Sequence, residues 1–276
     1  MIKRYTAILL IFMMIFTFTA CGGSENEDVP DQENQAEEQQ DIDEEETEES
    51  EGIKENIIDP SDAPEDDGAP PMGDDKTSRG VPDLIDVLAY DDGDLLVLVN
   101  KYHGVVPDYK PTDMVAVDPS LATWDDLELK SEAYDAYLEM YEDAKDEGFD
   151  IKICSAYRSY DTQKSLFNNA LANYDESFAH MYSAYPGRSE HHTGLAVDIT
   201  SESMGWGLRQ DFADFEDGKW LYDHCQDYGY ILRYLEGAED ITGYMYEPWH
   251  FRYVGKEAAA DIMSEGITLE EYLGEE

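Results

Sequence analysis

Residues 189–198 read Ser-Glu-His-His-Thr-Gly-Leu-Ala-Val-Asp and residues 247–250 read Glu-Pro-Trp-His, and these two segments decide the fold and the site of the chain. They supply imidazole nitrogens and carboxylate oxygens, two kinds of group that bind divalent cations. Such ligands suit Zn²⁺, and a zinc ion with three protein ligands keeps a fourth position open for water, as in catalytic sites. The candidate ligands are His191, Asp198 and His250, with Glu247 as an additional carboxylate.

The alternation of apolar and polar residues along 195–200 predicts a strand. The three large apolar side chains point to one side and Asp198 to the other, so this carboxylate lies on the face away from the core. His191 precedes Asp198 by seven residues, and a continuous strand would direct the two side chains to opposite faces. The chain must therefore turn between them, which Gly194 permits.

The second segment predicts a carboxylate next to the metal centre. Glu247 stands three residues before His250, and Pro248 allows the chain to bend at the start of the strand expected at 249–254. On that strand His250 and Arg252 share a face. Zinc lowers the pKa of a bound water to about 7. The expected reaction is attack by that water, with Glu247 as general base and then as general acid toward the leaving amine.

Further elements are predicted by working outward from these segments. Ser131 is the expected cap of a helix that ends at Gly148, Asp161 is the expected cap of the next helix, and Thr268 begins a capping box. Residues 95–99 are expected to form a strand or a buried extended segment. Other strands are expected at 151–154 and 230–234, and other helices at 220–228 and at the end of the chain. Because these elements lack regular βαβ spacing, we predict an α+β fold with a small antiparallel sheet flanked by helices.

Residues 1–21 resemble a bacterial lipoprotein signal. Lys3 and Arg4 precede an apolar run at 7–18 that is too short to span a bilayer, and small residues stand just before Cys21. The resemblance implies cleavage before Cys21, lipidation of its thiol, and an extracytoplasmic protein that is anchored to the cell membrane and faces the cell wall. An ordinary secretory signal with an incidental cysteine is the alternative, and it also exports the protein.

The rest of the chain divides by composition. Residues 22–80 hold 23 acidic residues against three basic ones, so we predict a disordered acidic tether, whose charge either extends it or only keeps it solvated. Residues 81–276 suffice for one folded domain. Its 42 acidic and 13 basic residues give a net charge of −29, which argues against nucleic acid as a partner. Cys154 and Cys225 either pair in this exported domain or stay separate as buried thiols.

The two opening segments resemble the signature of a known family. Ser-x-His-x-x-Gly-x-Ala-x-Asp followed by Glu-Pro-Trp-His is similar to the VanY-type D-alanyl-D-alanine carboxypeptidases. Residues 155–163, Ser-Ala-Tyr-Arg-Ser-Tyr-Asp-Thr-Gln, resemble the Tyr-Arg-Ser block of that family, and Gly-Tyr-Met-Tyr at 243–246 precedes the glutamate as the pattern would have it. The similarity extends from about residue 95 to about residue 273. It implies the compact hedgehog/D,D-peptidase fold, one zinc ion, and peptidoglycan stem peptides as substrate.

The resemblance also assigns the metal ligands. It makes His191, Asp198 and His250 the ligands of the zinc ion. The neighbouring His192 competes for the first of these places. The family pattern has its ligand three residues before the glycine, which is His191, and leaves the position of His192 open.

Four further residues receive roles from the resemblance. Glu247 is the catalytic carboxylate, and Arg158 recognises the substrate or stabilises the anionic oxygen of the transition state. Gln163 and Ser189 are the candidate substrate-binding residues. The function predicted is a zinc-dependent D,D-carboxypeptidase that removes the terminal D-alanine from a stem pentapeptide. The alternatives are an L,D-carboxypeptidase that acts on tetrapeptides and a non-catalytic cell-wall binding module, which would have no need of Glu247.

Overall fold

A four-stranded sheet forms the centre of the described domain. The computed structural model describes residues 84–89 and 93–275, so the predicted signal segment with Cys21 and the tether at 22–80 lie outside the described residues. The strand order is β5-β6-β8-β7, and each neighbouring pair is antiparallel. The strands are β5 (Ile151–Ser155), β6 (Ala196–Ser201), β8 (His250–Tyr253) and β7 (Tyr230–Leu232). This sheet confirms the predicted α+β class.

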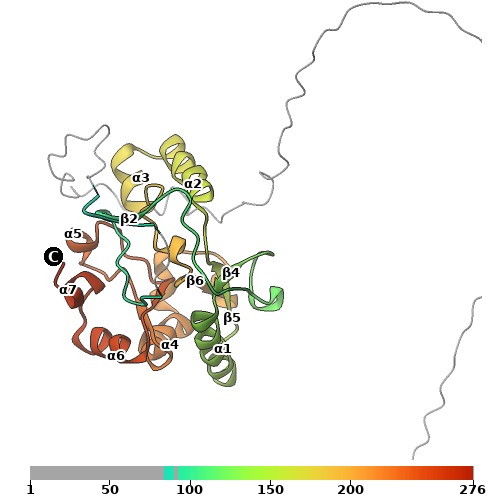
Figure 1. Cartoon of the computed structure of the whole chain (residues 1–276). Helices are drawn as coiled ribbons and strands as arrows, with labels where there is room; N and C mark the ends of the chain where they lie inside the picture. The colour runs from blue at the N-terminus through green and yellow to red at the C-terminus, as the bar shows by residue number, and fades with distance from the viewer. Residues whose placement is uncertain (1–83, 90–92, 276) are drawn as a thin grey trace, which may run out of the picture. The chain divides into compact units, whose positions relative to one another are not determined.

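Two short strand pairs and several helices surround the central sheet (Figure 1). The pairs are parallel β1 (Asp86–Leu88) with β2 (His103–Val105), and antiparallel β3 (Met114–Ala116) with β4 (Glu128–Lys130). The helices are α1 (Ser131–Asp146), α2 (Tyr160–Asn173), α3 (Glu176–Tyr182), α4 (Glu216–His224), α5 (Glu239–Thr242), α6 (Lys256–Glu265) and α7 (Leu269–Leu273). Helices α2 and α3 contact each other and lie side by side in Figure 1.

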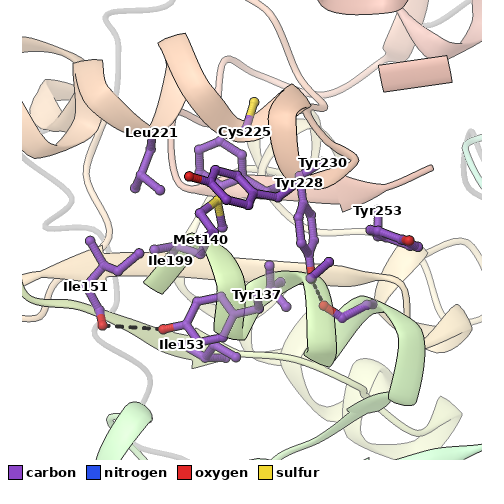
Figure 2. Packing of buried hydrophobic residues seen from close by; sticks show 14 of the residues in the cluster. Tyr137, Met140, Ile151, Ile153, Ile199, Leu221, Cys225, Tyr228, Tyr230 and Tyr253 are labelled. Carbon is purple, nitrogen blue, oxygen red and sulfur yellow. Dashed lines mark hydrogen bonds between the residues drawn. The ribbon is translucent and has the colours of Figure 1, made fainter. Parts of the chain in front are cut away.

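The main hydrophobic core lies between α1, α4 and the central sheet. Tyr137 and Met140 of α1 belong to the same buried cluster as Ile151 of β5 and Ile199 of β6, and Figure 2 shows these side chains together. The Tyr137 hydroxyl donates a hydrogen bond of 3.3 Å to the Ile151 carbonyl oxygen. Burial of one such aliphatic side chain stabilises the fold by about 1.5–3 kcal/mol. Because Ile199 is fixed on the core side of β6, the adjacent Asp198 faces the other side, as its alternation predicted.

Of the two states predicted for residues 95–99, the strand is not found, and their backbone is irregular. The carbonyl oxygens of Leu95 and Val97 accept hydrogen bonds of 2.9 and 2.8 Å from Nη2 of Arg252. A buried backbone carbonyl needs a donor, and here a guanidinium takes the place that a neighbouring strand would have. Residues 95–98 are half-buried and Val99 is buried, and the hydrogen-bond partner of this run is a side chain from β8.

Both predicted caps of the first two long helices are displaced. Ser131 is the first residue of α1, and the preceding Lys130 makes no side-chain cap. Ser159 caps α2, since its hydroxyl oxygen accepts a hydrogen bond of 3.1 Å from the Thr162 N–H, while Asp161 lies in the first turn. Serine and aspartate suit the N-cap about equally, so residue type alone does not choose between neighbouring positions.

Other predicted ends are confirmed. Gly194 has φ of 68° and ends a 3₁₀ helix, so the chain turns there before β6 begins. Gly148 follows α1 with φ of 94°. Thr268 and Glu271 form the predicted capping box of α7, each side chain accepting a backbone N–H of the other residue. The predicted start of the helix at 220–228 is not confirmed, because α4 already begins at Glu216, and after His224 a 3₁₀ helix continues to Tyr228.

Cys154 and Cys225 are both buried and form no disulfide with each other, so of the two predicted states the separate thiols are found. Burial raises the pKa of the Cys225 thiol to about 12, which makes it unreactive at neutral pH. Within 84–89 and 93–275, none of the helices has both the length and the apolar character required to cross a bilayer.

Candidate metal centre and active site

His191, Asp198 and His250 meet beside the central sheet. His191 lies in a 3₁₀ helix (Glu190–Thr193), and the antiparallel register pairs Asp198 of β6 directly with His250 of β8. All three side chains are buried, and their ligand atoms lie within 4.8 Å of one another. Nε2 of His191 is 3.3 Å from Oδ2 of Asp198, and Nδ1 of His250 is 3.0 Å from Oδ1. Ligand atoms about 2.0–2.1 Å from a tetrahedral zinc ion are roughly 3.4 Å apart, so this donor set fits zinc.

The hydrogen bonds of His191 determine which of its nitrogens faces the centre. Nδ1 lies 2.6 Å from the Ala156 carbonyl oxygen, and because a carbonyl only accepts, Nδ1 carries the proton. The lone pair of Nε2 therefore points toward Asp198. Burial lowers the pKa of His191 to about 4, although the Asp198 carboxylate opposes this shift. The ring is thus neutral at pH 7, which is the form that binds a metal ion.

His250 is surrounded by negative charge. Its Nδ1 lies 3.0 Å from Asp198 and 3.7 Å from Oε2 of Glu247, and its Nε2 lies 3.5 Å from Oε2 of Glu190. Burial alone would lower the pKa of His250, but the hydrogen bonds to Asp198 and Glu190 outweigh it and raise the pKa to about 9. Three carboxyl groups therefore surround one imidazole, and a divalent cation beside Asp198 would balance the charge of that carboxylate.

Glu247 sits in a turn that leads into β8. The His250 N–H donates a hydrogen bond of 3.0 Å to the Glu247 carbonyl oxygen, which closes the bend predicted at Pro248. The residue is 8% exposed, and burial raises the pKa of Glu247 to about 8, although the nearby His250 opposes the shift. A carboxyl group with a pKa near neutral, next to the candidate metal centre, has the properties of a general base and acid.

Arg158 is fixed in the wall of the site. Its Nε donates to Ser155 Oγ at 2.9 Å, its Nη1 to Gln163 Oε1 at 3.3 Å and its Nη2 to Asp198 Oδ2 at 2.8 Å. Among the described residues these acceptors engage three of the five guanidinium N–H groups, one on each nitrogen. Among the described residues the other N–H on each terminal nitrogen has no recorded acceptor, and Arg158 lines the cavity. The structure thus brings the predicted Arg158 to the predicted ligands.

Of the two predicted substrate-binding residues, Ser189 lines the cavity and Gln163 does not. Gln163 is fully buried, with its amide oxygen on Arg158 and its amide nitrogen donating 2.8 Å to the Ala184 carbonyl oxygen. It is absent from the described residues that line the cavity, so its hydrogen bonds hold Arg158. Ser189 does line the cavity. The predicted contact of Gln163 with substrate has no support in this geometry, because both ends of its amide are occupied by the protein.

A cavity of about 250 Å³ connects these groups. Its polar wall holds Arg158, Ser189, Glu247 and the three candidate ligands. Its remaining wall is largely aromatic and aliphatic and includes Trp124, Leu127, Leu166, Tyr174, Tyr182, Leu208 and Trp249. The cavity therefore combines a reactive end with an apolar surface for the body of a ligand, as small-molecule sites commonly do.

His192 has a positioning role that sequence reasoning missed. Its Nδ1 is 2.7 Å from the Arg158 carbonyl oxygen, and its Nε2 accepts a hydrogen bond of 3.1 Å from the Gly187 N–H. Burial lowers the pKa of His192 to about 4, so the neutral ring links the backbones of two segments that border the site. Its adjacency to a candidate ligand was a signal, but nothing in the sequence revealed either partner.

Glu190 was also missed. Burial alone would raise the pKa of Glu190, but the guanidinium groups of Arg233 and Arg252 outweigh it and hold the pKa well below the usual range. An ionised carboxylate thus lies fully buried behind His250. The pair of arginines is distant in sequence, so only the fold shows the cluster.

Comparison with known proteins agrees with this geometry. The family described as "VanY: D-alanyl-D-alanine carboxypeptidase" matches residues 126–256, which contain every candidate site residue of the domain. YodJ of Bacillus subtilis, named as a carboxypeptidase, is 45% identical over 181 residues, which cover 64% of this chain and 66% of YodJ. The chain thus spans just under two thirds of the length of that relative.

Solved structures share the fold. The L,D-carboxypeptidase LdcB has 44% sequence identity and a TM-score of 0.62, and the match covers 66% of this chain and 86% of LdcB. A variant of the D,D-pentapeptidase VanY from a VanB-type vancomycin resistance cassette, in complex with Zn(II), has 29% identity and a TM-score of 0.56. That match covers 64% of this chain and 98% of the VanY chain. The chain belongs to the VanY family of D-alanyl-D-alanine carboxypeptidases.

Proposed function

We propose that this protein is a zinc-dependent carboxypeptidase that removes the C-terminal D-alanine from peptidoglycan stem peptides. The observation that carries the proposal is the buried group of His191, Asp198 and His250, with the Glu247 carboxylate 3.7 Å from His250 in the same cavity. The family membership and the Zn(II) complex of the related VanY structure support it.

The three ligands would hold one zinc ion through Nε2 of His191, the Asp198 carboxylate and Nδ1 of His250. When bound, zinc supplies Lewis acidity toward the scissile carbonyl group and toward water. Asp198 has a second task, because its Oδ2 also accepts from Arg158 and so couples the position of the guanidinium to the centre.

Glu247 moves the proton in this proposal. Its carboxylate takes a proton from the attacking water and then delivers it to the nitrogen of the departing D-alanine. A pKa of about 8 suits both directions of transfer near neutral pH. The turn at Pro248 holds the carboxylate beside His250 without making it a fourth ligand.

Arg158 orients the substrate and stabilises charge. The remaining N–H groups on its two terminal nitrogens would donate to an anionic oxygen of the substrate. This oxygen is either the terminal carboxylate of the peptide or the oxyanion that forms at the scissile carbonyl. Ser155 and Gln163 hold the guanidinium, so little reorganisation is needed when charge develops.

A second candidate activity is cleavage of the L,D bond in a tetrapeptide stem. The specific observation in its favour is the identity of 44% to the L,D-carboxypeptidase LdcB, against 29% to the D,D-pentapeptidase VanY. In this chain both reactions would use the three ligands and the base named above. They differ in the configuration of the residue before the scissile bond, which the aromatic part of the cavity would contact.

Incubation of the protein with pentapeptide and tetrapeptide stems, followed by mass spectrometry, tests the proposal. Loss of one alanine from the pentapeptide alone establishes the D,D activity. Loss of one alanine from the tetrapeptide alone establishes the L,D activity. Loss from neither, with a full complement of zinc, would instead identify a cell-wall binding module and refute the proposed function.

We also propose that the enzyme works outside the cytoplasmic membrane, held by a lipid on Cys21 and extended toward the wall by the acidic tether at 22–80. The support is the signal-like composition of residues 1–21 and the acidity of the tether. Metabolic labelling with a fatty-acid analogue tests this placement. We expect label on the wild-type chain and none on Cys21→Ala, and equal labelling of both would refute the anchor.

A further inference from the structure

A buried carboxylate behind His250 has no part in the reaction described above. Oε1 of Glu190 accepts a hydrogen bond of 2.7 Å from Arg233 Nε and another of 2.8 Å from Arg252 Nη1. The side chains of Glu190 and both arginines are fully buried. Because two guanidinium groups hold the same oxygen, the carboxylate has a fixed orientation.

The arginines are themselves held from other directions. Arg233 donates to both oxygens of Glu270 of α7, at 2.8 and 2.7 Å. Arg252 donates to the carbonyl oxygens of Leu95 and Val97. Glu190 therefore stands on a rigid cluster that ties α7 and the segment at 95–97 to the central sheet.

The second oxygen of Glu190 faces the metal centre from behind. Its Oε2 lies 3.5 Å from Nε2 of His250, whose opposite nitrogen lies 3.0 Å from Asp198. Rotation of the imidazole by half a turn would remove both contacts. The ring of Tyr234, 4.8 Å from that of His250 and tilted by 37°, packs against the same side chain.

We propose that Glu190 is a positioning residue that accepts the Nε2 proton of His250 and so directs Nδ1 toward the metal. The inference rests on the proposed zinc binding. A carboxylate behind a histidine ligand fixes the tautomer and the orientation of its ring, and it makes the coordinating nitrogen more basic. Removal of such a partner typically costs about 10–100-fold in metal affinity or activity.

The chain offers a matched control in Glu270. Glu190→Gln and Glu270→Gln each remove one negative charge from Arg233 at nearly constant volume, but only Glu190 contacts His250. Both variants should unfold at a lower temperature than the wild type, because each weakens a buried ion pair. We would measure zinc affinity of the full chain by chelator competition, at a temperature where circular dichroism shows all three proteins folded.

We expect Glu190→Gln to bind zinc about 10–100-fold more weakly than the wild type, and Glu270→Gln to stay within about threefold. The visible spectrum of the cobalt-substituted proteins should change in Glu190→Gln alone, because the ligand field depends on the orientation of His250. Equal zinc affinities and equal spectra in the two variants would show that Glu190 only stabilises the fold, and would overturn the inference.

A measurement on the wild type keeps the test valid if Glu190→Gln does not fold. In the zinc-loaded protein, ¹⁵N NMR of the histidine rings should show His250 coordinated through Nδ1, with a proton on Nε2 that exchanges slowly with water. Coordination through Nε2, or a rapidly exchanging proton, would overturn the inference. A wild-type chain that takes up no zinc would refute the proposed function, whereas unchanged affinity in Glu190→Gln beside a zinc-binding wild type would refute the positioning role alone.

Discussion

Asp198 and His250 stand directly opposite each other on neighbouring antiparallel strands, with Oδ1 of the one 3.0 Å from Nδ1 of the other. Side chains at directly paired positions point to the same face of a sheet, with Cβ atoms roughly 4.5–5.5 Å apart. Two ligands are thus placed by strand register, and a register shift of one residue would move one of them to the opposite face. The third ligand, His191, comes from the 3₁₀ helix that ends at Gly194.

Loss of the Glu247 carboxylate should separate metal binding from catalysis. Glu247→Gln keeps all three ligands but has no proton acceptor, so we expect a full zinc content and a fall in kcat of about 10²–10⁴-fold. Elemental analysis and D-alanine release are the measurements. Glu236→Gln, an exposed change in the same part of the chain, serves as the control and should remain fully active. Turnover near the wild-type rate in zinc-loaded Glu247→Gln would rule out this carboxylate as the base.

The His192 ring should matter through Arg158. His192→Phe keeps an aromatic ring but removes the hydrogen bonds to the Arg158 carbonyl and the Gly187 N–H. A displacement of about 1 Å in a catalytic group can cost about 100-fold, so we expect kcat/KM to fall by about 10–100-fold with unchanged zinc content. His224→Phe, on α4, is the control. Zinc loss in His192→Phe would instead indicate that His192 supports the metal centre itself.

The pairing of Glu270 with Arg233 should make stability depend on pH. Burial alone would raise the pKa of Glu270, but Arg233 outweighs it and lowers the pKa below that of the unfolded chain, which is about 4.3. The pair therefore adds stability above that pH and loses it as the pH falls through the folded pKa. We expect the difference in unfolding free energy between wild type and Glu270→Gln to be full at pH 7 and to shrink in acid. Denaturant unfolding at several pH values measures it, and a difference that grows in acid would contradict the pairing.

Sequence patterns located the reactive groups because the position of each group depends on the geometry of a few neighbouring residues. Alternation placed Asp198 on the face away from the core, and the positive φ of Gly194 supplied the predicted turn. Pro248 marked the bend that sets Glu247 beside His250. These are properties of a few consecutive residues, which a sequence displays directly.

The supporting groups escaped prediction because they depend on pairs that are distant in the chain. Arg233 and Arg252 reach Glu190 across 43 and 62 residues, and no pattern in the sequence connects them. For the same reason the sequence left a strand and an extended segment open at 95–99, since the donor to the Leu95 and Val97 carbonyl oxygens is Arg252. Such contacts can be recognised only in the folded structure, where the strand register brings the distant residues together.

Zinc dependence of D-alanine release tests the central claim most directly. The measurement is mass spectrometry of a stem pentapeptide and a stem tetrapeptide incubated with the protein as purified, after removal of metal by a chelator, and after return of zinc. We predict one zinc ion per chain, loss of D-alanine release from the cleaved stem in the metal-free protein, and recovery when zinc is restored. Undiminished D-alanine release by the metal-free protein would contradict the assignment of His191, Asp198 and His250 as the ligands of a catalytic metal.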